Sequence, residues 1–395
     1  MAGPLTGLKV LDFTTLLPGP FATMNLADLG ADVLRITSES RPDGATLLPP
    51  LMPGTDMSFT VPYLQRGKRC ITLNLKDSRA VEIVHQLLHD DSYDVVVEQF
   101  RPGVMAKLGL SYEALEKINP SLIYCSITGY GQNGPLSLRA GHDINYLSRS
   151  GLMSYSGRKK GGPSLMGMQI ADVASGSYNA IIGILSAVIY RDRTGVGQHI
   201  DISMTDGAVA FNTLAGGAYL VNGIDPEREG TWLTGGILYD FYETKDSGRI
   251  SFGGLEPKFF AAFCEAIGLP ALIPGGVAPD NVEDAKERIY TVIKTKTREE
   301  WTRIFEKTDA CAEPVLSVSE ALNDPHTQAR NMVVELDLAW GGKMRQLANP
   351  IKFSKTHQKY ERAGVPAGTH TKEILRQLGY TDDEIDEFER QGLSR

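Results

Sequence analysis

The sequence lacks the signatures of several large protein classes. Its four cysteines are scattered without C-x-x-C spacing, so they indicate neither a zinc site nor a disulfide framework. No G-x-G-x-x-G follows the first expected strand, and the chain contains no P-loop, no G-x-S-x-G and no H-E-x-x-H. These absences argue against a dinucleotide-dependent dehydrogenase, a P-loop NTPase, an α/β-hydrolase and a zinc peptidase. We expect no metal site.

The chain also lacks an excess of basic residues and a long hydrophobic run. Its 40 Lys and Arg against 48 Asp and Glu give a net charge of −8, whereas nucleic-acid binding needs a basic face. The most apolar run, Ala180–Tyr190, is shorter than the ~18–20 residues of a membrane span. We therefore expect a buried helix there, with no membrane span and no nucleic-acid partner. The start of the chain carries no signal peptide, so we predict a cytoplasmic protein.

Strand-like and helix-like segments alternate through the first 200 residues. The expected strands are Leu8–Phe13, Asp32–Ile36, Ile71–Leu75, Asp94–Gln99, Leu122–Ile127 and His199–Ser203, and the longest expected helix is 174–190. Short crossovers between strands imply parallel pairing. The sequence thus predicts an α/β fold with an open, mostly parallel, Rossmann-like sheet and helices on its faces.

Composition changes divide the rest of the chain. At about 100–200 residues per domain the length implies two or three domains. We expect a large α/β domain over 1–215, a glycine-rich linker over 216–235 and a small α+β domain over 236–335. The small domain should contain strands at 248–252 and 314–318 with helices between them. An amphipathic helix pair is expected at 371–391.

Three polar segments are candidates for catalytic chemistry. His142 follows a glycine-rich loop past a strand end, where open α/β sheets bind ligands, and it should start a helix with Asp143 in the first turn. Free N–H groups at a helix start can hold an enolate oxygen. Asp172 precedes the long helix and is a candidate base or nucleophile. Each of these residues also has a purely structural interpretation when it is considered alone. His142 could be a surface histidine, Asp172 could be a helix N-cap, and Glu256 could be a solvated glutamate.

Basic residues gather near the expected strand ends on this acidic chain. They are Arg35, Arg101 and the compact turn Arg66–Arg69, which includes Lys68 and Arg69. Such groups could contact phosphates of an anionic ligand, or could form a solvated turn.

Many segments resemble the motifs of the class III CoA-transferase family. They are Leu5–Leu11, Pro18–Pro20, Leu26–Val33, Arg66–Arg69, Phe100–Val104, Asn119–Pro120, Ser126–Gly131 and Gly195–Asp201. The match runs from residue 5 to about residue 335. Within the family, Gly141–Tyr146, Leu255–Pro257 and Asp309–Val315 are similar to the α-methylacyl-CoA racemase branch.

This resemblance implies a reaction and its catalytic groups. The expected reaction is racemisation of 2-methylacyl-CoA thioesters through an enolate, with His142 and Asp172 as the two bases. Glu256 would orient His142, and the Asp143 N–H would stabilise the enolate. No metal or redox cofactor is expected, because the CoA is part of the acyl-CoA substrate.

The resemblance also implies an assembly and a CoA site. Family members are interlocked homodimers in which the large domain, completed by the returning C-terminus 336–395, shares each active site with the small domain of the partner chain. Glu256 should therefore approach His142 of the other chain. Arg35 and Arg101 are expected in the CoA site, with Lys68 or Arg69 as further candidates.

Two alternative functions are compatible with the same residues. In a CoA-transferase, Asp172 would be a nucleophile that forms an acyl anhydride, and His142 would not be needed. A catalytically silent CoA-binding protein would need none of these groups. Only two glycines, Gly253 and Gly254, stand where the transferases carry a multi-glycine loop, which favours the racemase. By contrast, Val173–Gly176 departs from the glycine run that usually follows the racemase aspartate.

Overall fold

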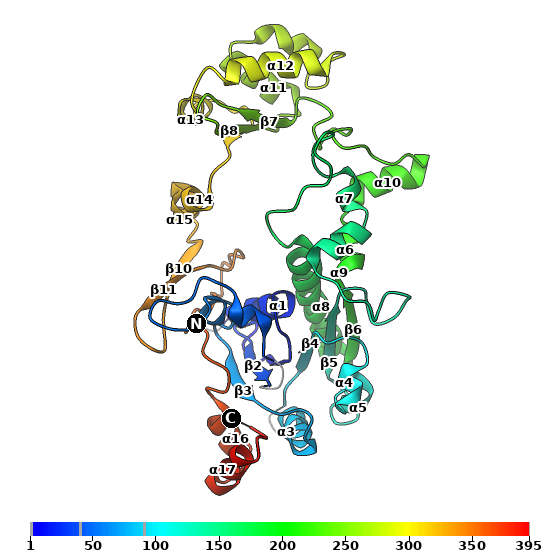
Figure 1. The fold of residues 1–395 in the computed structure, drawn as a ribbon, viewed down its shortest axis with the longest axis vertical. Coiled ribbons are helices and arrows are strands. Elements are labelled where there is room, and N and C mark those ends of the chain that lie inside the picture. Colours follow the sequence, from blue (N-terminus) through cyan, green and yellow to red (C-terminus); the bar gives the residue numbers. More distant parts are fainter. Residues whose placement is uncertain (1–2, 39–41, 90–91, 395) are drawn as a thin grey trace. The chain divides into compact units, whose positions relative to one another are not determined.

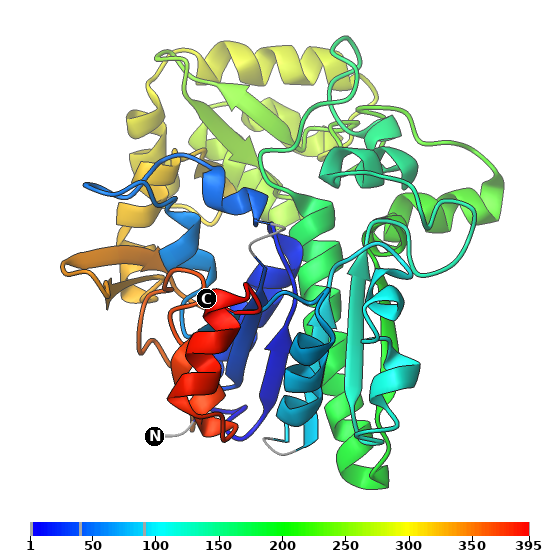
Figure 2. The same ribbon diagram turned by 60° about the horizontal axis from the view of Figure 1, so that its bottom comes forward.

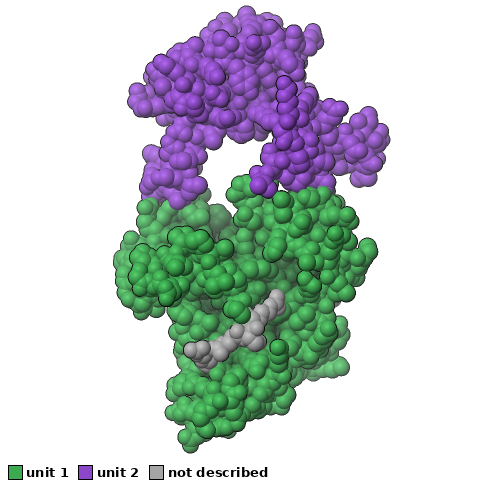
Figure 3. Space-filling model, in the orientation of Figure 1, with its two compact units in different colours: residues 1–150, 166–211, 329–395 green, residues 151–165, 212–328 purple. Residues whose placement is uncertain are grey.

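The computed structural model describes residues 3–38, 42–89 and 92–394. The chain forms two compact units (Figure 3). The first comprises 1–150, 166–211 and 329–395, and the second comprises 151–165 and 212–328. Residues 151–165, which we placed in the large domain, thus group with the second unit.

A six-stranded sheet forms the centre of the first unit (Figure 1). Its strands are β1 (Lys9–Asp12), β2 (Asp32–Thr37), β3 (Arg69–Thr72), β4 (Val95–Glu98), β5 (Ile123–Thr128) and β6 (Gln198–Ser203). They lie in the order β3-β2-β1-β4-β5-β6, and every pair is parallel. The predicted parallel α/β sheet is confirmed. In such a sheet ligands bind where the strand order reverses, which here is between β1 and β4.

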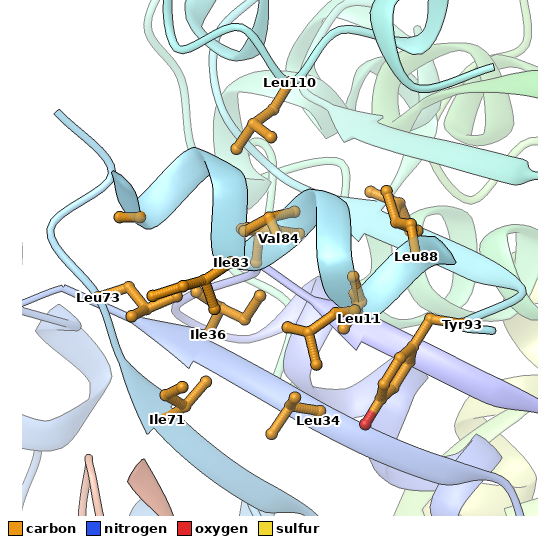
Figure 4. Packing of buried hydrophobic residues seen from close by; sticks show 14 of the residues in the cluster. Leu11, Leu34, Ile36, Ile71, Leu73, Ile83, Val84, Leu88, Tyr93 and Leu110 are labelled. Atoms are coloured by element: carbon orange, nitrogen blue, oxygen red, sulfur yellow. The ribbon is translucent and has the colours of Figure 1, made fainter. Parts of the chain in front are cut away.

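Helices cover both faces of this sheet. One face carries α1 (Pro18–Asp28) and α8 (Asn179–Thr194), and the other carries α3 (Ser78–His89), α4 (Val104–Lys107), α5 (Tyr112–Leu115), α16 (Thr371–Gln377) and α17 (Asp382–Arg390). Figure 4 shows strand residues such as Leu11 and Leu34 packed beneath Ile83 and Val84 of α3. Burial on both faces explains the nearly continuous apolar runs of β1 to β5.

The C-terminal segment completes the first unit. After β10 (Val333–Asp337) and β11 (Lys343–Leu347), the chain places α16 against β3 (Figure 2). Asn74 N–H donates to the carbonyl of Leu393 at 2.8 Å, and Arg66 Nη1 donates to the carbonyl of Leu347 at 2.8 Å. The shorter elements of this unit are η1 (Gly44–Leu47), α2 (Thr60–Leu64), α6 (Asp143–Arg149), the π-helical η2 (Ala171–Tyr178) and α9 (Met204–Ala210).

The second unit is a small α+β fold with its own core. Its antiparallel sheet, in the order β7-β8-β9, consists of β7 (Asp240–Glu243), β8 (Arg249–Phe252) and β9 (Ala312–Pro314). Phe252, Phe263 and Phe305 stack in this core together with the buried Trp301. The helical elements are α7 (Leu152–Tyr155), α10 (Thr213–Asn222), α11 (Pro257–Ala266), η3 (Pro270–Gly275), α12 (Val282–Ile293), α13 (Arg298–Phe305), α14 (Val318–Asn323) and α15 (Pro325–Ala329), the last of which ends at the boundary between the units.

Two local predictions in this unit are wrong. The strand expected at 314–318 ends at Pro314, because a capping box between Ser317 and Glu320 starts α14 there instead. The segment expected as a linker from residue 216 is helical up to Asn222, because α10 accommodates Gly216 and Gly217.

The long apolar helix is buried on one side only. Together η2 and α8 span Ala171–Thr194, which among the described residues is the one helix long and apolar enough to cross a membrane. Its α8 part packs on β5 and β6, while Ile182 and Ile189 are 61% and 54% exposed. The helix that we expected to be buried is therefore buried on one face only. A helix of a folded domain that packs one face on a sheet can be equally long and apolar. The length and apolar character of Ala171–Thr194 are therefore weak evidence for a membrane span.

Candidate active site

The start of α6 positions His142. As the sequence predicts, the helix begins here, with the exposed His142 as its N-cap in an extended conformation. Asn145 Oδ1 accepts from the His142 N–H at 3.0 Å. Tyr146 OH donates to the carbonyl of Gly141. The residue before the histidine and the histidine itself are thus both fixed by side chains of the same helix.

Tyr146 is a structural residue of this helix start, and the sequence analysis gave it no role. A Cβ atom at Gly129 would lie 2.4 Å from its ring, and one at Gly141 would lie 2.6 Å away. Tyr130 packs edge-on against the ring at 5.2 Å. Burial raises the pKa of Tyr146 to about 12, so the phenol remains a neutral donor. The glycines at 129 and 141 were the signal in the sequence that a ring lies between these segments.

Substitution of Gly129 by alanine should displace this ring. We expect the free energy of unfolding to fall by about 1–3 kcal/mol, because a new Cβ in a packed contact forces its neighbours to move. Thermal unfolding measures the change. Gly217→Ala is the matched control, since a Cβ there meets nothing within 4 Å in a helix, and it should be neutral or slightly stabilising. Equal stability of the two variants would contradict the described packing of Tyr146.

Asp172 lies inside the first turn of η2. The N-cap of this helix is Ile170, so the alternative in which Asp172 is the cap is wrong. Burial, followed by the charge of Asp143, raises the pKa of the Asp172 carboxyl to about 7. Ser177 Oγ donates to the Asp172 carbonyl at 3.1 Å and to the Pro18 carbonyl at 2.7 Å. The π-helical turn, of a kind frequent at functional sites, was not predicted; the unusual Val173–Gly176 segment was its only sign.

Asp143 joins the two candidate bases. Its Oδ1 accepts from the backbone N–H of Ala171 at 2.7 Å and of Asp172 at 3.1 Å. His142 is therefore next in sequence to a residue that is hydrogen-bonded to Asp172. The structure brings His142, Asp143 and Asp172 together in the first unit.

A cavity of about 760 Å³ opens at the carboxyl ends of β1 to β4. Arg35, Lys76 and Phe100 are among its lining residues. The buried Arg35 pairs with Asp43 at 2.7 Å, and its Nε has no hydrogen-bond partner among the described residues. The cavity lies at the point of the sheet where the strand order reverses, which is the expected ligand position.

Arg101 directly follows the cavity-lining Phe100 in the sequence. It is exposed, and its charge acts on Tyr146, where it opposes the rise of the tyrosine pKa. A cation in this place can contact an anionic ligand that extends from the cavity toward His142.

Two of the expected phosphate contacts do not fit the structure. Lys68 is 1% exposed, and its Nζ donates to Asp12, Thr23, Gln65 and the Pro20 carbonyl. Arg69 begins β3 at the amino edge of the sheet, away from the cavity, and donates to Asp32, Tyr93 and Gln377. Both side chains therefore stabilise the fold by contacts within the protein, and the prediction that they contact CoA does not agree with this structure.

Glu256 belongs to the second unit. It is exposed at the N-cap of α11, directly before Pro257. Its pairing with His142 of a partner chain remains a prediction. Over residues 3–38, 42–89 and 92–394, no group of three or more His, Cys, Asp or Glu side chains is placed to hold a metal ion.

Comparison with known proteins decides the family. The sequence profile of CoA-transferase family III matches residues 5–371. This chain belongs to that family. It is 34% identical to human succinyl-CoA:glutarate CoA-transferase, over 99% of this chain and 90% of the relative. It is also 34% identical to human alpha-methylacyl-CoA racemase, over 96% of this chain and 95% of the relative.

A solved structure supports the same assignment. A CAIB/BAIF family protein from Brucella suis superposes with a TM-score of 0.84 at 29% identity, covering 96% of this chain and all of that one. Family III thus contains relatives named as racemases and as CoA-transferases at similar identity to this chain.

Proposed function

We propose that this protein racemises 2-methylacyl-CoA thioesters by moving the α-proton from one face of the acyl group to the other. His142 takes the proton from one enantiomer, and an enolate forms. The protonated Asp172 then delivers a proton to the opposite face. In the reverse direction Asp172 is the base and His142 is the acid.

The observation that carries this proposal is the place of Asp172, whose backbone N–H donates to Asp143 at 3.1 Å beside the start of the His142 helix and whose carboxyl has a pKa raised to about 7. A group that must alternate between acid and base works best when its pKa lies near the working pH. Imidazole is the side chain that most often serves as general acid or base in enzymes. Both candidate bases are therefore groups that can take up and release a proton.

The start of α6 supplies the groups that would stabilise the enolate. N–H groups in the first turn of a helix have no partner within the helix, and the Asp143 N–H follows His142 directly. Glu256, supplied by the second unit of a partner chain in an interlocked homodimer, would orient His142 and stabilise its charged form. Electrostatic stabilisation of this kind is usually the largest contribution to such a reaction.

The cavity beside Arg35 is the proposed site of the CoA nucleotide. Its carboxyl-edge position, the Arg35 Nε, which has no hydrogen-bond partner within the described part of the chain, and Arg101, next in sequence to the lining residue Phe100, fit an anionic ligand with an aromatic base. The CoA belongs to the substrate, and the proposed reaction uses no further cofactor.

CoA transfer is the second candidate function, favoured by the names of several relatives at 31–35% identity. In that reaction the ionised Asp172 would attack the thioester carbonyl and expel the CoA thiolate. A carboxyl with a pKa of about 7 is partly protonated at neutral pH, which lowers its nucleophilic fraction. His142 would have no role in that reaction.

Incubation in D₂O separates these functions. With one enantiomer of a 2-methylacyl-CoA and no acceptor acid, we expect deuterium uptake at the α-carbon together with loss of chirality. A transferase would give neither, but would move CoA once a free carboxylic acid is added, and hydroxylamine would trap a derivatised Asp172. That second result would contradict the racemase.

A further inference from the structure

The chain leaves the first unit between its two candidate bases. His142 precedes α6, residues 151–165 belong to the second unit, and Asp172 lies in the segment that returns at residue 166. Within the second unit this excursion is anchored by Arg158, which pairs with Glu229 at 2.7 Å and with Asp240 at 2.6 Å. The backbone between the bases therefore does not by itself fix their spacing.

Within the first unit, the Asp143 side chain joins the segment before residues 151–165 to the segment after them. Its Oδ1 accepts the N–H groups of Ala171 and Asp172, 28 and 29 residues further along. These donors belong to the first turn of the helix, so they have no acceptor one turn earlier. Ala171 is completely buried, so water is a poor substitute for the carboxylate at this point.

We propose that the Asp143 carboxylate is a positioning residue that fastens the Asp172 helix to the His142 helix and so fixes the spacing of the two bases. This role rests on the proposed function and is separate from the backbone N–H of the same residue. Through these two hydrogen bonds, the Asp143 Oδ1 atom holds the backbone of Ala171 and Asp172 in position.

The charge of Asp143 has a second effect that the same residue can test. Among the described residues, Asp143 and Tyr146 of α6 interact electrostatically with Asp172, and the tyrosine stays neutral. Helices α1, α8 and α9 and strands β5 and β6 also pack on η2, and their described residues contribute no charge to the shift. Because a like charge raises the pKa of a carboxyl, removing it must lower the pKa of Asp172.

Hydrogen exchange tests the fastening without any assay of activity. In Asp143→Ala the amides of Ala171 and Asp172 lose their acceptor, and we expect their exchange, followed by mass spectrometry of the peptide around 170–173, to become about tenfold faster. Asp143→Asn keeps an acceptor oxygen and should retain the protection. Thr381→Ala, which removes the N-cap of α17 in the same unit, is the control and should leave this peptide unchanged. Unchanged protection in Asp143→Ala would overturn the proposal.

Kinetics provide the second readout. Deuterium uptake should fall roughly 10²-fold in Asp143→Ala, since misplaced bases lose their near-attack geometry, while Asp143→Asn keeps most of the rate.

The pH profile gives a third readout. For the enantiomer from which Asp172 takes the proton, the rate rises with pH as Asp172 ionises. This rising limb of the pH profile should move to lower pH in Asp143→Asn. If Asp143→Ala does not fold, Asp143→Asn decides the question, because an unshifted limb would show that the Asp143 side chain does not act on Asp172 and would overturn the proposal. If the wild-type protein showed no deuterium uptake, the proposed racemase function would be wrong. The role of Asp143 would still be decided by the amide exchange.

Discussion

Replacement of His142 by alanine is expected to abolish deuterium uptake from the enantiomer whose α-proton faces this residue. Loss of a general base lowers rates by about 10²–10⁴-fold. The other enantiomer can still lose its proton to Asp172, so it should exchange without inverting. His142→Ala therefore converts a racemase into an enzyme that exchanges one enantiomer with retention, which chiral analysis of the recovered thioester measures.

Asp172→Asn is expected to give the complementary pattern. Exchange should persist only from the enantiomer that His142 deprotonates, and racemisation should be lost. His326→Ala is the matched control, because this histidine is exposed on α15, and it should exchange both enantiomers at the wild-type rate. Unchanged uptake from both enantiomers in His142→Ala would rule out the two-base scheme.

Lys68→Met is expected to cause the largest loss of stability. The substitution leaves the Asp12 carboxylate, which is completely buried and 3.1 Å from Lys68 Nζ, without its counter-charge. Breaking a buried ion pair from one side costs about 3–5 kcal/mol. Chemical denaturation should show this as a lower midpoint.

The control for this substitution is Lys107→Met, which removes an exposed lysine at the end of α4. It should change the free energy of unfolding by no more than about 0.5 kcal/mol. If both variants were equally stable, Lys68 would not be the structural residue that its contacts indicate. It would then again be a candidate for contact with a ligand.

The sequence predicts the architecture well because the architecture depends on local patterns. Apolar runs of four to six residues, each followed by a turn and a helix, are enough to specify a parallel sheet. The start of α6 follows in the same way from a glycine-rich loop and the polar residues around His142. These features need no knowledge of distant contacts.

Other features depend on contacts that a sequence pattern does not contain. A basic turn looks the same whether it meets a phosphate or, like Lys68, a buried aspartate more than fifty residues away. The hydrogen bonds from Ala171 and Asp172 to Asp143 join segments separated by residues of another unit. Within the π-helical turn, Gly176 packs closely against Met204 and Pro18. Each of these needs the tertiary structure.

The C-terminal return also sets the order in which the molecule can be built during translation. Ile374, Leu375, Ile385 and Leu393 belong to the same core as α3 and the central strands. The strands of the first unit are synthesised early, but the C-terminal residues that cover them are synthesised last. The nascent sheet therefore stays partly uncovered until almost the whole chain has been made. Nascent strands with exposed apolar surface are prone to aggregation, so chaperone binding during synthesis should be concentrated on β1 to β5 rather than on the second unit.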